Sequence, residues 1–228
     1  FNVSSLFNKF VGESERNFRS FVETIEASAP VVVFIDELEK AFAQQSNDAV
    51  GKRLLGEFLT WLQDKPSDVT VVATANEIRG LPPEMLRTGR FDKRFFVDLP
   101  NQEERLEILK IQLDRVPRQS RFAHLSVSVK LSQNELAAIA SDTQDCNGSD
   151  IEAIVTDAVI SAAVDNNGTL DNACIQEGIQ GIIPYGKQNE AQVKALREWA
   201  RTNAVRANDD CKSKPKAPKS RGKATLRI

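Results

Sequence analysis

Two adjacent carboxylates, Asp36 and Glu37, come directly after the apolar run Val31–Ile35. Open α/β sheets bind ligands at the carboxyl ends of their strands, so this run, read as a strand, places both acids at a ligand-binding edge. Nucleotide hydrolysis uses such a pair, because one carboxylate holds Mg²⁺ and the next orients and deprotonates the attacking water. The pattern favours Asp36 for the metal and Glu37 as the base; the alternative is a strand that ends in an ordinary charged loop.

An asparagine and two arginines with suitable chemistry follow. Asn76 comes after a second apolar run, Val69–Ala73, so we expect it at the same sheet edge, where its amide can bond a γ-phosphate oxygen and the lytic water. Arg87 and Arg90 flank a glycine, and the rigid guanidinium suits the charge of a phosphoryl-transfer transition state, often in trans. Taken singly, these residues also fit an ordinary turn asparagine and solvated or salt-bridged arginines.

Helical and strand patterns alternate before Pro100, which predicts an α/β domain with a parallel sheet. The unbroken β-branched and aromatic run Val31–Ile35 is typical of a strand buried on both faces. The other predicted elements are a helix at Glu13–Ala29, a helix at Val50–Gln63, a strand at Val69–Ala73, a short helical turn that Leu81–Pro83 opens, and a third strand at Arg94–Val97.

Strand patterns fade after Pro100. The predicted helices are Gln102–Arg115, Asn134–Ser141, Ser149–Val164, Asn172–Gly178 and Glu190–Arg201. We therefore expect an α/β domain at 1–113 and a helical part at 114–207. Residues 208–228 are rich in lysine, proline and serine, which predicts a basic, disordered tail.

The composition argues against several classes of protein. A formal net charge of −2 gives no reason to expect a dedicated nucleic-acid binder, and no apolar run approaches the roughly 20 residues that cross a bilayer. Three widely spaced cysteines (Cys146, Cys174 and Cys211) without a Cys-x-x-Cys pair argue against a disulfide framework or a zinc site. They fit a reducing compartment. The composition is equally compatible with the cytoplasm and with the plastid stroma.

The order and spacing of these motifs resemble the AAA family of ring ATPases. About 40 residues separate the Asp-Glu pair from the asparagine, and about 11 more lead to the first arginine. The resemblance implies that Asp36 and Glu37 are the Walker B pair and Asn76 the sensor-1 residue. It also implies that Arg87 and Arg90 are paired arginine fingers, and that the cofactors are ATP and Mg²⁺.

The resemblance covers roughly residues 1–205 and implies a fold: a P-loop NTPase-like parallel sheet flanked by helices, then a small all-α lid. Gly148 and Ser149 match the Gly-(Ala/Ser)-Asp-(Ile/Leu) motif that opens a lid helix beside the nucleotide. The alternative for Ser149 is a plain helix N-cap.

A candidate substrate-contacting loop lies near the start of the chain. Lys9, Phe10 and Val11 match the family's first pore loop, where an aromatic side chain grips an extended polypeptide in the central channel. The alternative is that Phe10 packs at the base of the following helix. The implied partners are copies of the chain in a ring, most often a hexamer, and a protein substrate.

Within the family, the chain looks most similar to an uncharacterised cyanobacterial and plastid-encoded group. The stretches that carry this impression are Phe34–Phe42, Thr60–Leu62 and Leu196–Ala200.

One family motif, Gly-x-x-x-x-Gly-Lys-(Ser/Thr), occurs nowhere in the sequence. The family places this phosphate-binding loop roughly 25 to 30 residues before Phe10. A truncated sequence and a degenerate member that no longer binds nucleotide are the two explanations, and the intact acid, base, sensor and fingers favour truncation. We expect the first strand and helix of the sheet to be absent as well, the sheet to expose apolar surface, and the chain alone to bind ATP poorly.

Three functions stay open on this reading. The favoured one is an ATP-hydrolysing module that remodels or translocates a protein through a ring pore. The second is a non-hydrolysing module for assembly or regulation. The third, a role on nucleic acid, has only the basic tail to support it (Lys212, Lys214, Lys216, Lys219, Arg221 and Lys223), and such tails are usually just solvated.

Overall fold

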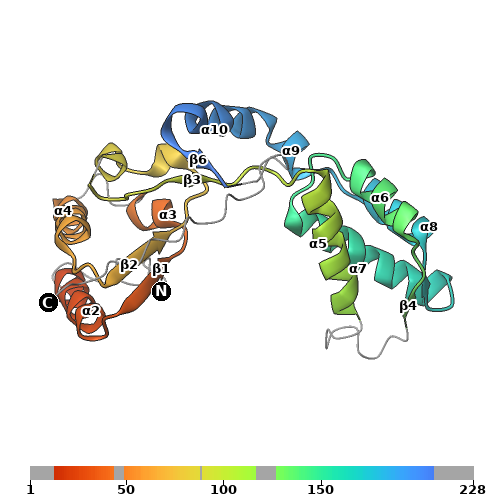
Figure 1. Ribbon diagram of the computed structural model, residues 1–228, viewed down its shortest axis with the longest axis horizontal. Coiled ribbons are helices and arrows are strands. Elements are labelled where there is room, and N and C mark those ends of the chain that lie inside the picture. The colour runs from red at the N-terminus through yellow and green to blue at the C-terminus, as the bar shows by residue number, and fades with distance from the viewer. Residues whose placement is uncertain (1–12, 44–48, 88, 117–126, 208–228) are drawn as a thin grey trace, which may run out of the picture. The chain divides into compact units, whose positions relative to one another are not determined.

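The computed structural model describes residues 13–43, 49–87, 89–116 and 127–207 (Figure 1). The chain divides into two compact units, Phe1–Arg94 and Phe95–Ile228. The predicted pore-loop residues Lys9, Phe10 and Val11 lie outside the described residues, as does the predicted tail at 208–228.

The first unit contains a parallel pair of strands, β1 (Val31–Ile35) and β2 (Val69–Ala73), with the bounds that the sequence predicted. Helices α2 (Glu13–Ala27) and α4 (Ala49–Asp64) lie side by side next to the pair (Figure 1). Their apolar stripes meet one face of the strands. The buried core so formed comprises Phe18, Ile25, Val33, Ile35, Leu38, Leu54, Phe58, Leu59, Trp61, Leu62, Val69 and Met85.

The other face of this pair is exposed. Alternate side chains of a strand point to opposite faces, and Val32 is 66% exposed while Val33 is buried. Phe34 and Val72 are also exposed, at 47% and 45%. The prediction that Val31–Ile35 is buried on both faces is therefore wrong for the described chain, because α2 and α4 cover one face only. The expectation that the sheet would expose apolar surface is confirmed.

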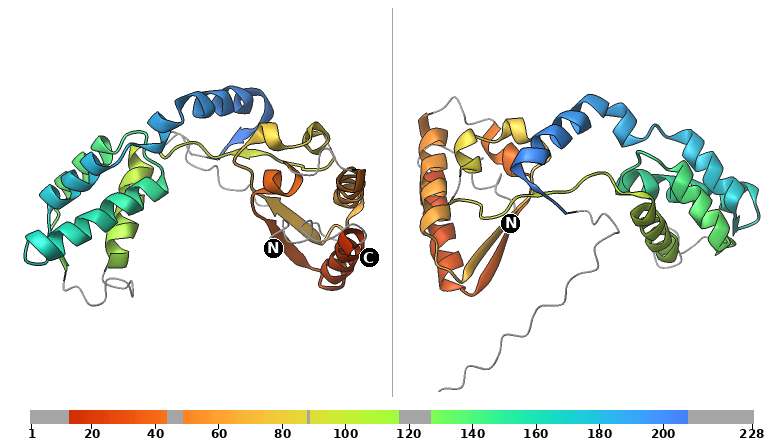
Figure 2. Two further views of the ribbon diagram at one scale, coloured as in Figure 1. Left: turned by 180° about the vertical axis from the view of Figure 1, so that it is seen from behind. Right: turned by 45° about the horizontal axis from the view of Figure 1, so that its top comes forward.

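The second unit has a helical core. It is formed by α5 (Gln102–Arg115), α6 (Gln133–Asp142), α7 (Gly148–Asp165) and α8 (Asn172–Gly181), with a short parallel pair, β4 (Ser128–Val129) and β5 (Thr169–Leu170) (Figure 2). The first three helices each begin with a capping box, which satisfies amide groups that a helix start leaves unpaired. Since α5 packs on α6 and α7, it belongs to this unit. Along the chain, the division between the two units falls between Arg94 and Phe95, earlier than the boundary near 114 that the sequence suggested.

Two cysteines are part of this helical core. Cys146 and Cys174 are buried free thiols. Burial raises the pKa of the Cys146 thiol to about 11. A thiol with so high a pKa carries almost no thiolate near neutral pH, so Cys146 acts as a small apolar residue.

The third predicted strand does not join the β1–β2 pair. It is the two-residue strand β3 (Phe95–Phe96), and it pairs in parallel with β6 (Val205–Arg206) at the end of the described chain. Between them in sequence come α9 (Tyr185–Gln188) and α10 (Glu190–Asn203). The sequence could not show this pairing, because a two-residue strand has no periodicity and its partner is far away along the chain.

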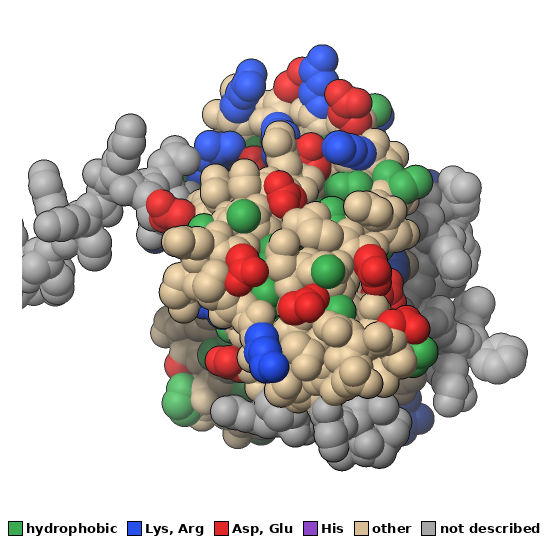
Figure 3. Space-filling model, turned by 90° about the vertical axis from the view of Figure 1, so that its right-hand side faces the viewer, with side chains coloured by type: hydrophobic (Ala, Val, Ile, Leu, Met, Phe, Trp, Pro, Cys, Tyr) green, Lys and Arg blue, Asp and Glu red, His purple; other side chains and the backbone are tan. Residues whose placement is uncertain are grey.

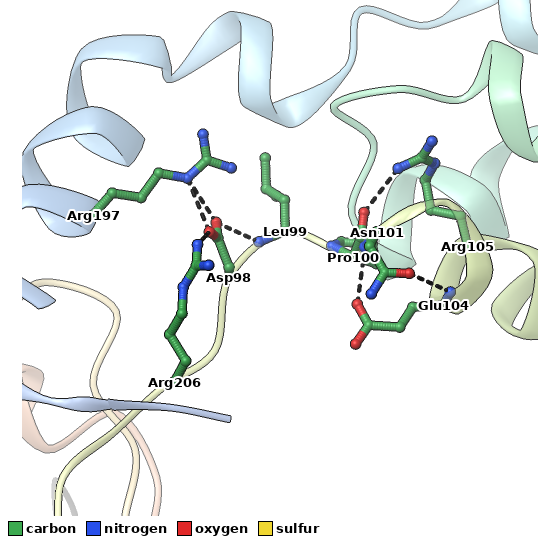
Figure 4. A network of polar contacts seen from close by, with 8 residues as sticks. All are labelled: Asp98, Leu99, Pro100, Asn101, Glu104, Arg105, Arg197 and Arg206. Carbon is green, nitrogen blue, oxygen red and sulfur yellow. Dashed lines mark hydrogen bonds and ion pairs between the residues drawn. The ribbon is translucent and has the colours of Figure 1, made fainter. Parts of the chain in front are cut away.

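Asp98, in the segment that follows β3, binds arginines of α10 and β6 (Figure 4). Its carboxylate accepts from Arg197 Nε at 2.8 Å and from Arg206 Nη2 at 3.1 Å. Two residues on, the chain is held to α6, because the buried Arg105 donates to the carbonyls of Pro100 at 2.8 Å and Ala140 at 3.0 Å. The segment that follows β3 is thus fixed on both sides by arginines.

The contact between α7 and α8 depends on a glycine. An ideal Cβ at Gly178 would lie 2.7 Å from the Ile154 carbonyl oxygen, whereas one at Gly181 on the same helix would meet no described atom within 4 Å. Gly178→Ala should therefore lower the free energy of unfolding by about 1–3 kcal/mol through overpacking. Gly181→Ala, the matched control, should change it by less than about 0.5 kcal/mol. Urea unfolding measures both, and equal effects would contradict the close packing.

No helix in the described part of the chain is both long and apolar enough to span a membrane. Acidic side chains are spread over one face of the helical unit (Figure 3). The sequence accounts for this, since residues 127–182 hold nine acidic residues and one lysine.

Candidate functional site

The carboxyl ends of β1 and β2 bring the predicted acids and amide together. Ile35 and Ala73 are register partners, so Asp36 and Thr74 each follow the end of a neighbouring strand. The Thr74 hydroxyl donates to Asp36 Oδ1 at 2.5 Å and accepts from the Glu37 backbone N–H at 3.0 Å. Thr74 therefore holds both members of the acidic pair, a contact that no sequence pattern indicated.

Glu37 has an unusual backbone. Its φ of 51° lies in the left-handed region, which costs a residue other than glycine about 1–3 kcal/mol. The turn leads from β1 into the short helix α3 (Leu38–Ala43). It is fixed by Thr74, whose backbone N–H donates to Ile35 O and whose carbonyl accepts from Leu38 N, both at 2.9 Å. Strain that the surroundings enforce in this way is common at functional sites.

The Glu37 side chain faces two polar groups. Its Oε1 accepts from Asn76 Nδ2 at 3.4 Å and pairs with Lys40 Nζ at 2.5 Å. The hydrogen bond from Lys40 to Glu37 raises the pKa of that lysine. Because the Lys40 side chain is 63% and the Glu37 side chain 38% exposed, solvent screens the pair and it is weak enough to open. Asn76 thus lies at the same sheet edge as Glu37, as expected, and Lys40 is a further contact that the sequence did not indicate.

The Asp36 side chain suits a magnesium ion. It is exposed at the sheet edge, with the Thr74 hydroxyl on one of its oxygens. No group of three or more His, Cys, Asp or Glu side chains that could hold a metal occurs among the described residues. Mg²⁺ commonly takes one or two carboxylates from the protein and its other ligands from water and substrate phosphates, and the exposed Asp36 carboxylate has the chemistry of such a ligand.

The two candidate finger arginines have different surroundings. Arg90 is partly buried, and its Nη1 donates to the Glu84 carbonyl at 2.6 Å. Between them, Gly89 has a φ of 92°, a conformation that favours glycine. Arg87 is exposed, and its side chain forms no hydrogen bond or ion pair with the described residues. Within the described chain, neither arginine is bonded to Asp36 or Glu37. Arg90 stabilises the loop through Glu84, and Arg87 is exposed to solvent.

The lid candidates lie at the start of α7. Gly148 is the first residue of the helix, and an ideal Cβ there would meet no described atom within 4 Å. Ser149 is exposed, and the N-cap is Asn147, whose side chain accepts from Asp150 N at 2.8 Å. The alternative that Ser149 is the N-cap is therefore wrong. Asp150 also accepts from the Tyr185 backbone N–H at 2.9 Å, which joins α7 to α9.

Comparison with known proteins decides the family. Residues 1–99 match the family described as "ATPase family associated with various cellular activities (AAA)". Through these residues the chain belongs to the AAA family. The match contains the whole acid, amide and arginine set described above.

Relatives of this AAA chain agree with that assignment. An "Uncharacterized AAA domain-containing protein ycf46" of Pyropia yezoensis is 36% identical over 206 residues, which are 87% of this chain and 39% of the relative. A proteasome-activating nucleotidase of Pyrococcus horikoshii is 34% identical over 162 residues, 68% of this chain and 37% of the relative. The chain thus spans about two fifths of the length of these relatives. The predicted resemblance to the uncharacterised plastid-encoded group is confirmed.

The fold is that of an AAA domain. The crystal structure of the FIGL-1 AAA domain superposes with a TM-score of 0.70 at 22% sequence identity, covering 90% of this chain and 68% of that one. The predicted fold class, a parallel α/β unit followed by a helical one, is confirmed.

Proposed function

We propose that the complete protein hydrolyses Mg-ATP at the edge formed by β1 and β2. The observation that supports this best is the convergence of Asp36, Glu37 and Asn76, with the Asn76 amide 3.4 Å from the Glu37 carboxylate. An acceptor for a proton and a neutral amide that close together can both contact one water molecule. Family membership adds the expectation of an ATPase.

Each residue has a distinct part in this proposal. Asp36, fixed by Thr74, would hold Mg²⁺, which when bound neutralises charge on the phosphates. Glu37 would take the proton of the attacking water on its exposed carboxylate. Asn76 would turn its amide from Glu37 to the water and a γ-phosphate oxygen. Its present hydrogen bond is long enough to be exchanged at little cost.

The site would be completed by neighbours in a ring, for which we propose a hexamer. Arg87, which is exposed, would reach into the adjacent subunit's site, with Arg90 holding the loop beside it. Gly148 and Ser149 would contact the nucleotide. Because the Gly-x-x-x-x-Gly-Lys-(Ser/Thr) motif is not in this sequence, we expect the 228-residue chain by itself to turn over ATP poorly.

The proposed substrate is a polypeptide drawn through the ring. One relative, 34% identical over 162 residues, is by its name a nucleotidase that activates the proteasome. The segment 127–182, with nine acidic residues and one lysine, does not suit the phosphate backbone of a nucleic acid. Lys9, Phe10 and Val11 would grip the polypeptide, by analogy with the family's pore loop.

This proposal predicts that an unfolded polypeptide stimulates ATP turnover by the full-length protein. Phe10→Ala should abolish the stimulation and leave basal turnover within about twofold, because binding remote from the reacting atoms is removed. Phe10→Tyr is the matched control and should keep the stimulation. Phosphate release is measured with and without a permanently unfolded protein. ATP-dependent oligomerisation without any phosphate release would instead support a non-hydrolysing assembly module.

A further inference from the structure

A second glutamate lies in the turn that carries the proposed base. Glu39 is the second residue of α3 and is only 6% exposed. A carboxylate so deeply buried is costly unless hydrogen bonds replace the water that it loses. No motif in the sequence assigns a role to Glu39.

Glu39 holds the backbone of the proposed sensor. Its Oε1 accepts from the Asn76 backbone N–H at 3.0 Å. Its aliphatic part packs against Gly80, where an ideal Cβ would lie 3.3 Å from Glu39 Cβ. The side chain therefore reaches from α3 to the short 3₁₀ helix η1 (Ile78–Gly80). Its Oε1 is bonded to the Asn76 backbone.

The second oxygen of Glu39 is not satisfied. Glu39 Oε2 is buried and has no hydrogen-bond partner among the described residues. A buried carboxylate with one oxygen unsatisfied costs free energy, which a single hydrogen bond offsets only in part. The cost indicates that the bond to Asn76 matters for something other than stability.

Two glutamates that follow β1 bind Asn76, one at its backbone N–H and the other at its side-chain amide. Glu39 binds its backbone N–H, and Glu37 accepts from its side-chain amide at 3.4 Å. We infer that Glu39 is a positioning residue, which fixes the main chain of Asn76 so that its side-chain amide stays within reach of both Glu37 and the attacking water. This inference rests on the proposed function of Glu37 and Asn76, and Glu39 itself does not touch the reacting atoms.

The test is a series of variants of the full-length protein. Glu39→Met removes the acceptor and keeps the volume, so kcat for ATP should fall about 10- to 100-fold while KM changes less than about threefold. Glu39→Gln keeps a carbonyl acceptor for Asn76 N–H and should stay within about threefold of wild type. Glu77→Met, on an exposed glutamate next to Asn76, is the control and should leave kcat unchanged.

A double mutant separates positioning from a structural role. If Glu39 acts through Asn76, then Glu39→Met should cost nothing further in an Asn76→Ala background. The same loss in both backgrounds would overturn the inference, as would wild-type kcat in Glu39→Met or a Gln variant as slow as the Met variant. Unfolding in urea should show a midpoint for Glu39→Met close to that of wild type, because removal of the unsatisfied oxygen offsets the lost hydrogen bond.

Hydrogen exchange tests the contact without any turnover. The Asn76 amide proton should exchange about tenfold faster or more in Glu39→Met and remain protected in Glu39→Gln. Unchanged protection in the Met variant would overturn the inference. If the wild-type protein releases no phosphate, the proposed function fails, and the exchange measurement still decides whether Glu39 holds Asn76.

Discussion

Glu37→Gln in the full-length protein is expected to bind ATP as wild type does and to lose at least about a hundredfold in turnover. Glutamine keeps the size of the side chain and can still accept from the Asn76 amide. It also leaves the strained backbone and its bond to Thr74 in place. What it cannot do is take a proton from water. Binding is measured with a fluorescent ATP analogue and turnover by phosphate release.

The matched control for this variant is Glu77→Gln, which changes an exposed glutamate beside Asn76 in the same way. It should leave both ATP binding and turnover unchanged. Turnover at the wild-type rate in Glu37→Gln would remove Glu37 from the role of base. Loss of ATP binding in the same variant would mean that the substitution disturbs the site and not the proton transfer alone.

Arg87→Ala is expected to reduce turnover about a thousandfold in the assembled protein, because an arginine finger stabilises charge in the transition state. Arg87 is exposed and forms no hydrogen bond or ion pair with the described residues, so its removal should cost little stability. Urea unfolding checks the stability and phosphate release checks the turnover.

Mixed assemblies test whether Arg87 acts in trans. An Arg87→Ala subunit keeps its base, and a Glu37→Gln subunit keeps its finger. When the two inactive proteins are mixed, a Glu37→Gln subunit can supply Arg87 to the site of an Arg87→Ala neighbour, and turnover should return in part. Mixtures that stay as inactive as the separate variants, although they form joint assemblies, would contradict a finger in trans.

Local patterns in the sequence predicted the strands and long helices well. β1 and β2 have the predicted bounds because a continuous β-branched run between turns is a strong signal. α5 also matches in full, since Asn101 and Glu104 form the capping box that starts it. The helices α3 and α9 were missed, as six and four residues are too few to show a helical period.

The site could be predicted only in part. The convergence of Asp36, Glu37 and Asn76 followed from the rule that parallel strands end at one edge. Thr74 and Glu39 could not be found that way, because their roles depend on register and on the direction of individual side chains. The different surroundings of Arg87 and Arg90 likewise arise from the path of the loop and not from the motif.

The proposal depends most on whether the complete protein hydrolyses ATP. Steady-state phosphate release by the full-length protein with Mg-ATP, with the Glu37→Gln variant as the blank, answers this. The proposed site predicts turnover on the order of 1 to 10 per second per subunit, well above the blank. Phosphate release no faster than the blank, in a protein that binds ATP and assembles, would contradict an ATPase and leave a nucleotide-binding assembly module.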